Sequence, residues 1–415
     1  MFRQYRRPPA VHLALVLLAA SGVTAANEQE QPESWPDWLK EAMAREAGVL
    51  ESTPIALADG QYRFRLAGKA GEPGAFDGGW YVESDIGGDG PLECYLLTDS
   101  TDLATLIVNI ADINIEAQAE GYGGAVGNRS VAALDAGAID GVPYLALEWM
   151  YTIGEAPEAL LGLTKVRAAS NGDVVQACAH NVVGYRDTFR RVFEKFVRSA
   201  QVPGSNAEPY YEEVAVQSVG GQRVGVAIAT YTLDEAGDSR VDMSMSSLIP
   251  VGPGSLSYED SSTINWSSPD GLLINAYTAN TQNGDLVTNL ELARNEKGDW
   301  LVAGTFQGKE IEVVIDGAAE PLSELGQMQV TRKLFAGKAA EAAFAVWLAD
   351  ADPTRILEGR LVRDESSDAL SGELMLGPMA FDARFDASGA LTRAEMQMGA
   401  TVISIDRIWH RGAPK

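Results

Sequence analysis

The chain has 415 residues, 46% of them hydrophobic and 22% charged, and 58 acidic residues against 32 basic ones give a formal net charge of -26. This composition is typical of a folded globular protein with room for two or three domains. Its negative field repels phosphate groups, so we expect no nucleic-acid partner.

The N-terminus has the features of a secretory signal peptide. Three arginines precede an apolar run at residues 10–20, and the small residues of 23–25 match the pattern that signal peptidase cleaves. We expect residues 1–26 to be removed by cleavage near Ala25 or Ala26, which predicts a periplasmic or secreted bacterial protein. No later stretch reaches the roughly 18–20 apolar residues of a membrane span, so no transmembrane segment is expected after cleavage.

The first region, residues 27–202, mixes helical and strand patterns. Apolar spacing predicts a helix at 35–47 and another at 103–120, although the second segment is β-branched enough to form a strand. Alternating or turn-bounded runs predict strands at 61–66, 80–83, 130–136 and 144–151, and a hairpin at 163–177 turned at Asn171-Gly172. The region is therefore predicted to be an α+β domain, a sheet with helices packed on it.

An amphipathic helix at 185–200 closes this region, with an apolar stripe at helical spacing. Its polar side is basic within a strongly acidic chain. We interpret this side as a solvated face whose charges balance acids elsewhere, and the alternative is a docking face for an anionic partner or headgroup. The basic residues are Arg186, Arg190, Arg191, Lys195 and Arg198.

Cys94 and Cys178 are the two cysteines of the chain, and each lies in a strand-like run. In an exported protein, an even pair predicts one disulfide. The alternative is a reactive thiol, because Cys178 and His180 are two residues apart and point to the same side of a strand. A catalytic thiol must be free, so we favour the disulfide and assign no catalytic residue.

Residues 203–209 have the composition of a linker, and residues 210–415 change to a period of two. Glycine-containing pairs separate the apolar runs at hairpin spacing, which predicts an antiparallel meander. One helical stretch is expected at 321–346. The predicted fold class is thus α+β: an N-terminal α+β domain and a larger β-meander, a curved sheet or half-barrel, with a covering helix.

The glycine-punctuated segments at 219–225, 267–273, 283–284 and 298–302 resemble periplasmic families of unknown function whose meander is similar to that of outer-membrane lipoprotein carriers. The resemblance covers about residues 210–315. It implies a curved, incompletely closed antiparallel sheet with helices against its concave side, and a groove that can shelter an acyl chain. The lipid-binding residues of the carriers have no residue-by-residue match here.

Several methionines lie on the predicted strands, some at alternating positions. They fill an ordinary core or line a pliable apolar groove, since methionine adapts its shape to its surroundings. These groove candidates are Met243, Met245, Met375, Met396 and Met398. Two acids in otherwise apolar strands, Glu93 and Glu148, are expected on a solvated face.

The sequence lacks the motifs of the common enzyme classes. Only His180 and His410 follow the signal peptide, and neither a zinc-binding spacing nor a phosphate-binding loop occurs, so no metal and no cofactor is expected. The favoured hypothesis is an exported envelope protein that binds an apolar or amphiphilic ligand, or an envelope protein, without catalysis. A secreted hydrolase using carboxylates or bound calcium, and a structural or interaction module, are the alternatives.

Overall fold

The computed structural model describes residues 36–414 except 89, 99–101, 156–158, 173, 204–207, 253 and 368. Within these residues the chain is mostly antiparallel β-structure with few helices, arranged as one separate hairpin and two larger sheets. This confirms the predicted fold class. The expected signal peptide, its cleavage site, Trp35 and most of the expected linker lie outside the described residues.

The first half of the described chain folds into a separate hairpin, β1 with β2, and a sheet of eight strands, called the N-terminal sheet below. The elements are α1 (Asp37–Met43), β1 (Ser52–Leu57), η2 (Ala58–Gly60), β2 (Tyr62–Ala67), β3 (Lys69–Ala70), β4 (Gly74–Phe76), β5 (Gly79–Asp85), β6 (Leu92–Leu97), α2 (Leu103–Tyr122), β7 (Val126–Ile139), β8 (Val142–Ile153), β9 (Leu160–Asn171), β10 (Val174–His180) and α3 (Arg186–Ser199). The strand order is β3-β5-β6-β10-β9-β8-β7, with β4 added beside β5.

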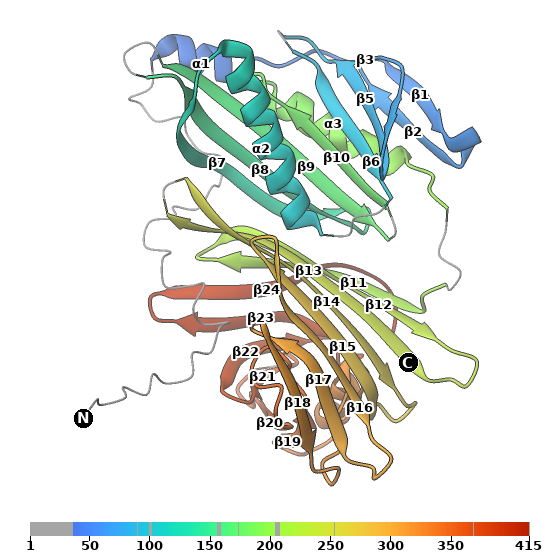
Figure 1. Ribbon diagram of the computed structural model, residues 1–415. Helices are drawn as coiled ribbons and strands as arrows, with labels where there is room; N and C mark the ends of the chain where they lie inside the picture. Colours follow the sequence, from blue (N-terminus) through green and yellow to red (C-terminus); the bar gives the residue numbers. More distant parts are fainter. Residues whose placement is uncertain are drawn as a thin grey trace.

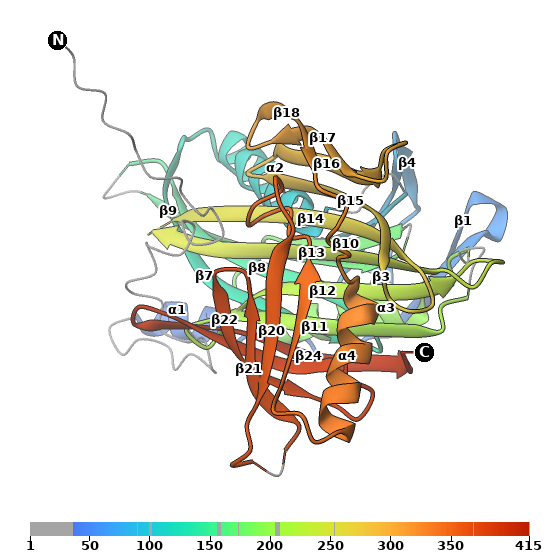
Figure 2. The same ribbon diagram turned by 90° about the horizontal axis from the view of Figure 1, so that it is seen from below.

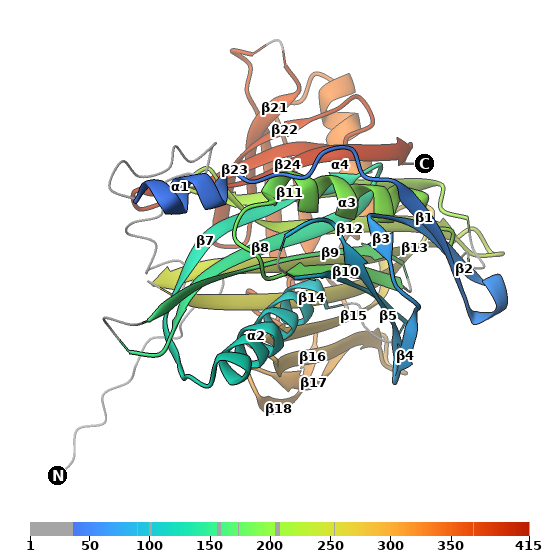
Figure 3. The ribbon, with the colours of Figure 1, turned by 90° about the horizontal axis from the view of Figure 1, so that it is seen from above.

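Helices α2 and α3 cover opposite faces of the N-terminal sheet. Figure 1 shows α2 in front of the sheet and α3 behind it. Helix α2 buries Leu103, Ile107 and Ile110 at helical spacing, which decides the segment against the alternative strand. Helix α3 buries Phe189 and Phe193 against the other face. Seen from above, α1, α3 and the β1–β2 hairpin lie along the same side of the sheet (Figure 3).

The predicted disulfide is present and lies in the middle of the N-terminal sheet. Cys94 of β6 and Cys178 of β10 are directly opposite each other on paired antiparallel strands. Their sulfur atoms are bonded, and both residues are buried behind α3. The bridge joins the part of the sheet that comes before α2 to the part that comes after it.

The second half of the described chain forms a sheet of fourteen strands, called the trough below. Its elements are β11 (Tyr211–Val219), β12 (Gln222–Leu233), β13 (Ser239–Gly252), β14 (Ser255–Ser267), β15 (Leu273–Gln282), β16 (Asp285–Arg294), β17 (Trp300–Phe306), β18 (Lys309–Ile315), α4 (Glu324–Ala336), β19 (Glu341–Val346), β20 (Leu357–Arg363), β21 (Ser371–Leu376), β22 (Met379–Phe385), β23 (Leu391–Met398) and β24 (Thr401–Gly412).

The strand order of the trough runs from β18 back to β11, then from β24 back to β19. The first and last strands therefore meet inside the sheet, and β18 and β19 are its edges among the described strands. Seen from below, β15–β18 curl inward along one side and β20–β22 along the other, with α4 at the open side (Figure 2). The sheet is curved and open, as the meander pattern predicted.

The prediction of a single helix at 321–346 is wrong for the second half of that segment. The structure ends α4 at Ala336 and forms β19 from Glu341–Val346, which pairs with β20 along its whole length. Alanine-rich sequence favours a helix, but backbone pairing and the contact of Phe344 with Gly359 override that preference here. None of the helices in the described chain is long and apolar enough to cross a membrane.

The outer, convex face of the trough packs on the N-terminal sheet. Val214, Val226 and Leu248 share one buried cluster with α2, β7 and β8. The side chain of Asp260 in β14 accepts hydrogen bonds from the backbone N–H groups of Ala104 and Thr105 at the start of α2. The proposed division at 203–209 thus separates two sheets that share a core. Since the convex face is occupied, the concave face is where a hollow can form.

Candidate functional site

The concave face of the trough is hollowed where its two sides curl inward. Described residues line a larger cavity of about 380 Å³ and, beside it, a smaller cavity of about 210 Å³. Both cavities are lined by Asp350 and Met379, so they are neighbours on the concave face, and we call the two together the hollow. Asp350 lies in the turn between β19 and β20, and Met379 begins β22.

Strand alternation decides which side chains reach the larger cavity. Successive side chains of a strand point to opposite faces, so Met245, Ser247 and Ile249 of β13 all face the hollow. Both sides of the trough add apolar side chains, which makes most of the wall apolar. These are Val287, Phe306, Phe381, Met396, Ile403 and Ile405.

The structure brings together some of the methionines singled out from the sequence. Met245 and Met396 line the larger cavity, and Met243 lines the smaller one. Met398 packs beside Met396 against a neighbouring apolar cluster. Met375 in β21 is half-buried and is not among the lining residues of either cavity.

Met379, which both cavities share, was missed by the sequence analysis. Its signal was the Gly377-Pro378 turn, which places the next residue at a hairpin tip. That turn gives no information on where the tip points, because the direction depends on how the whole sheet curves.

The ionisable side chains at the hollow are carboxyls. Glu259 and Asp350 line the larger cavity, and Glu324 lines the smaller one together with Asp350. Burial raises the pKa of Glu259, a hydrogen bond from Asn280 opposes the rise, and the charge of nearby Asp350 adds to it. Burial also raises the pKa of Asp350 and of Glu324. Among the described residues, no group of three or more histidine, cysteine, aspartate or glutamate side chains is placed to hold a metal ion.

Two hydrogen-bond acceptors in the wall of the larger cavity lack a partner within the described structure. Asn280 is 9% exposed, and its Nδ2 donates to Glu259 Oε1 over 2.5 Å while its Oδ1 has no donor. Gln217 Oε1 is likewise buried without a donor. A buried acceptor without a donor costs free energy, so these atoms are suited to a ligand that donates.

Glu148 does not lie on a solvated face, contrary to the sequence-based expectation. Its carboxylate is 2.6 Å from Arg186 Nη2, with 18% of the side chain exposed. Next to it, Lys165 is fully buried and donates to the carbonyl of Val182, and burial lowers its pKa to about 8. Both faces of β8 are covered, one by α2 and the trough and the other by α1 and α3, so alternation alone misassigned this face.

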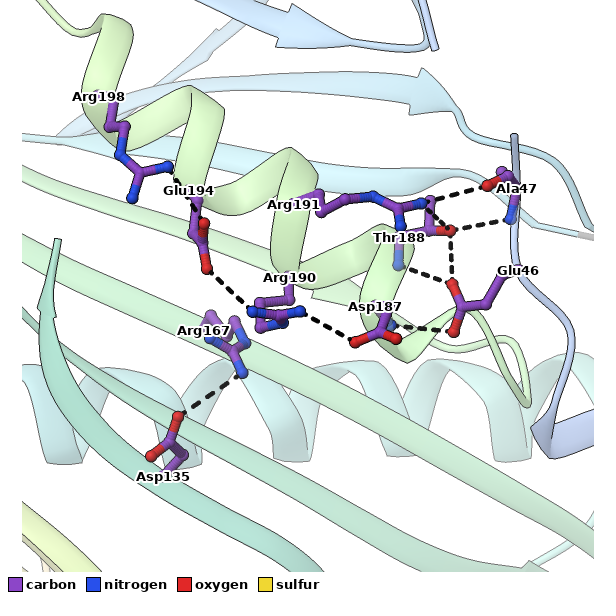
Figure 4. A network of polar contacts seen from close by, with 10 residues as sticks. All are labelled: Glu46, Ala47, Asp135, Arg167, Asp187, Thr188, Arg190, Arg191, Glu194 and Arg198. Carbon is purple, nitrogen blue, oxygen red and sulfur yellow. Dashed lines mark hydrogen bonds and ion pairs between the residues drawn. The ribbon is translucent and has the colours of Figure 1, made fainter. Parts of the chain in front are cut away.

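The basic residues of α3 are engaged mainly with neighbouring acids and backbone atoms. Figure 4 shows Arg190 between Asp187 and Glu194, and Arg198 bonded to Glu194. Arg191 donates to the carbonyl of Ala47 and to Thr188 Oγ1, and Arg186 binds Glu148. Lys195 lines a separate hollow of about 490 Å³ beside residues 47–50. These contacts fit the favoured interpretation, a face whose charges are balanced within the molecule, and docking of an anionic partner at α3 stays the untested alternative.

The Cys178 and His180 pair does not form a nucleophile and base. The Cys178 sulfur is committed to the disulfide. His180 is fully buried, and burial together with the charge of Lys165 lowers its pKa to about 3, so the ring is neutral at physiological pH. His410 is exposed.

No model of a known protein family matches the chain, and no curated protein matches it. Solved structures with similarity to the chain include a beta-barrel-like protein of domain of unknown function DUF1849 from Brucella abortus, with 11% identity and a TM-score of 0.38 over 50% of this chain and 98% of that one. A DUF1089 family protein from Pseudomonas aeruginosa has 12% identity and a TM-score of 0.21 over 46% of this chain and 93% of that one. The resemblance to lipoprotein carriers stays a prediction.

Proposed function

We propose that this is an exported bacterial envelope protein that binds an apolar or amphiphilic ligand in the hollow of the trough, without catalysing a reaction. The carrying observation is the pair of neighbouring, mostly apolar cavities on the concave face, lined by Met243, Met245 and Met396. Ligand sites are typically concave and apolar with a few convergent polar groups, and this hollow has that composition.

The disulfide supports the exported location. Bonds of this kind form and persist in oxidising compartments such as the bacterial periplasm. The proposed signal peptide at residues 1–26 supplies the route. Burial of both cysteines under α3 also limits the access of reducing thiols to the disulfide.

The test is native mass spectrometry of the mature protein purified from a bacterial periplasm, before and after organic extraction, together with binding of the apolar dye N-phenyl-1-naphthylamine. We expect a co-purifying mass of several hundred daltons that leaves on extraction, and saturable dye binding by the extracted protein. A protein that carries no extra mass and binds no dye contradicts the proposal.

Cavity-filling variants locate the site. Met245→Trp and Met396→Trp place a larger ring in the wall of the larger cavity, so each is expected to lower dye affinity at least about tenfold. Met375→Trp is the matched control, since Met375 is also half-buried in the trough but does not line either cavity. Equal binding by all three variants would place the dye elsewhere and contradict the proposal.

A further inference from the structure

The charge of the hollow restricts the head group of its ligand. Among the described residues that line the two cavities, every ionisable side chain is a carboxyl: Glu259, Asp350 and Glu324. A carboxylate or phosphate group of a ligand would meet like charges in a partly desolvated space, where repulsion is strong. Anionic amphiphiles are therefore poor occupants.

The uncharged polar side chains of the larger cavity favour a ligand whose head group donates hydrogen bonds. The Glu259 carboxylate accepts hydrogen bonds when ionised, so the amide nitrogen of Asn280 faces it and the amide oxygen faces away. That oxygen belongs to a side chain only 9% exposed and has no donor in the described structure. Gln217 also lines this cavity, and its Oε1 is buried without a donor. Two of the side chains that line the larger cavity thus have an amide oxygen without a donor in the described structure.

The polar atoms share the larger cavity with a long apolar wall. Ile249, Phe306, Phe381 and Met396 line it together with Glu259, Asp350 and Asn280. A molecule that fills this space has to be apolar over most of its length and rich in N–H donors at one end.

We infer that the ligand is an amphiphile with an aliphatic ammonium head group, whose N–H donors bind Glu259, Asp350 and the Asn280 oxygen while its hydrocarbon chain lies against the methionines and phenylalanines. This inference rests on the proposed function and names the substrate class of the same site. An ammonium group supplies three N–H donors and one positive charge. The donors can bind the amide oxygen that lacks a partner, and the charge is complementary to that of the carboxylates.

The test compares three ligands with the same chain and different heads. Decylammonium, decanol and decanoate are titrated into the extracted full-length mature protein by calorimetry, below their micelle-forming concentrations. We expect decylammonium to bind at least about tenfold more tightly than decanol, and decanoate to bind most weakly.

Variants at and away from the cavities separate the effect of the site from that of the overall negative charge. The double variant Glu259→Gln with Asp350→Asn keeps the shape of the cavity and is expected to weaken decylammonium binding at least about tenfold, with decanol affinity unchanged. The matched control, Glu358→Gln with Asp270→Asn, removes the same charge from two exposed positions that line neither cavity and is expected to leave both affinities unchanged. Glu259→Gln and Asp350→Asn are also measured singly, so that one misfolded protein does not decide the result.

The outcomes distinguish the two proposals. If decanol or decanoate binds as tightly as decylammonium, or if the variant Glu259→Gln with Asp350→Asn leaves decylammonium binding unchanged, the head-group inference is overturned while the binding function stands. If none of the three ligands binds, or if Met245→Trp does not weaken any of them, the binding function itself fails.

Discussion

Asp350 shows how a single residue links the hollow to stability. It borders both cavities and keeps accessible surface, yet burial raises its pKa and no ion pair offsets the cost among the described contacts. Groups held unfavourably in the native state are often retained for binding, since a site optimised for a ligand is not optimised for the empty fold.

Asp350→Asn is expected to stabilise the ligand-free protein at neutral pH. An unfolded Asp titrates near pH 4. Since the native pKa is higher, the carboxyl favours the native state below that pH, and this contribution is lost as pH rises through the native pKa. The advantage of the variant should therefore be absent at acidic pH and grow towards neutrality in urea denaturation.

Asp352→Asn, two residues away, is expected to change the stability at neutral pH in the opposite direction. Although burial opposes the shift, hydrogen bonds from Thr354 and the charge of Arg355 lower the pKa of Asp352. Its ionised form stabilises the native state, and that contribution is lost only as pH falls through the lowered pKa. This variant should be less stable than the natural protein at neutral pH, and two variants that shift in the same direction would contradict the assignment.

At the scale of elements, local sequence patterns predicted most helices, strands and turns. Long-range contacts decided where some of these elements end and which residues they bring together. The apolar spacing of α2 and α3 and the Asn283-Gly284 turn were readable because period and turn chemistry are local. The end of α4 and the start of β19 were not, since pairing with β20 is set by the whole sheet. Glu259 and Asp350 could not be selected among 58 acids, because sheet curvature, which period two does not encode, brings them together.

The contact of Asp260 with α2 is an example that no local signal predicts. This carboxylate from β14 accepts the backbone N–H groups of Ala104 at 2.9 Å and Thr105 at 2.8 Å, as well as the hydroxyl of Ser246. It lies about 155 residues along the chain from the helix whose first turn it satisfies. The trough therefore caps a helix of the N-terminal sheet.

Asp260→Ala is expected to destabilise the protein by about 1–3 kcal/mol, because it removes a helix cap and leaves two N–H donors without an acceptor. Amide hydrogen exchange should accelerate in the first turn of α2, which reports the cap directly. Asp234→Ala is the control, since that side chain accepts only within its own exposed turn. Unchanged exchange in α2 would show that the cap does not hold the helix.

At the scale of the whole molecule, the pairing of β11 with β24, the first and last strands of the trough, joins its two meanders into one sheet. Arg407 of β24 lies at this join with only 8% of its side chain exposed. It contacts Glu213 of β11 and Asp386 beside β23, and it donates to the hydroxyl of Tyr211. One buried guanidinium thus ties both meanders together.

Arg407→Met is expected to destabilise the protein by about 3–5 kcal/mol, because it leaves two partly buried carboxylates without their counter-charge. Arg411→Met on the same strand is the control. Arg411 pairs with Glu212 at the exposed end of β24, with 61% of its side chain accessible, so less than about 1 kcal/mol is expected. Equal losses in urea denaturation would show that the buried network has no special role.

The meeting of β11 and β24 has a consequence for how the protein is made. Strands β11–β18 can pair with their neighbours as they emerge, since each hairpin is local in sequence. The other meander, β19–β24, can do the same. Their union needs β24, which ends at Gly412, so one edge of β11 stays unpaired until the whole of the other meander has been synthesised. A chain shortened before β24 would therefore present the unpaired edge of β11 to any other strand it meets.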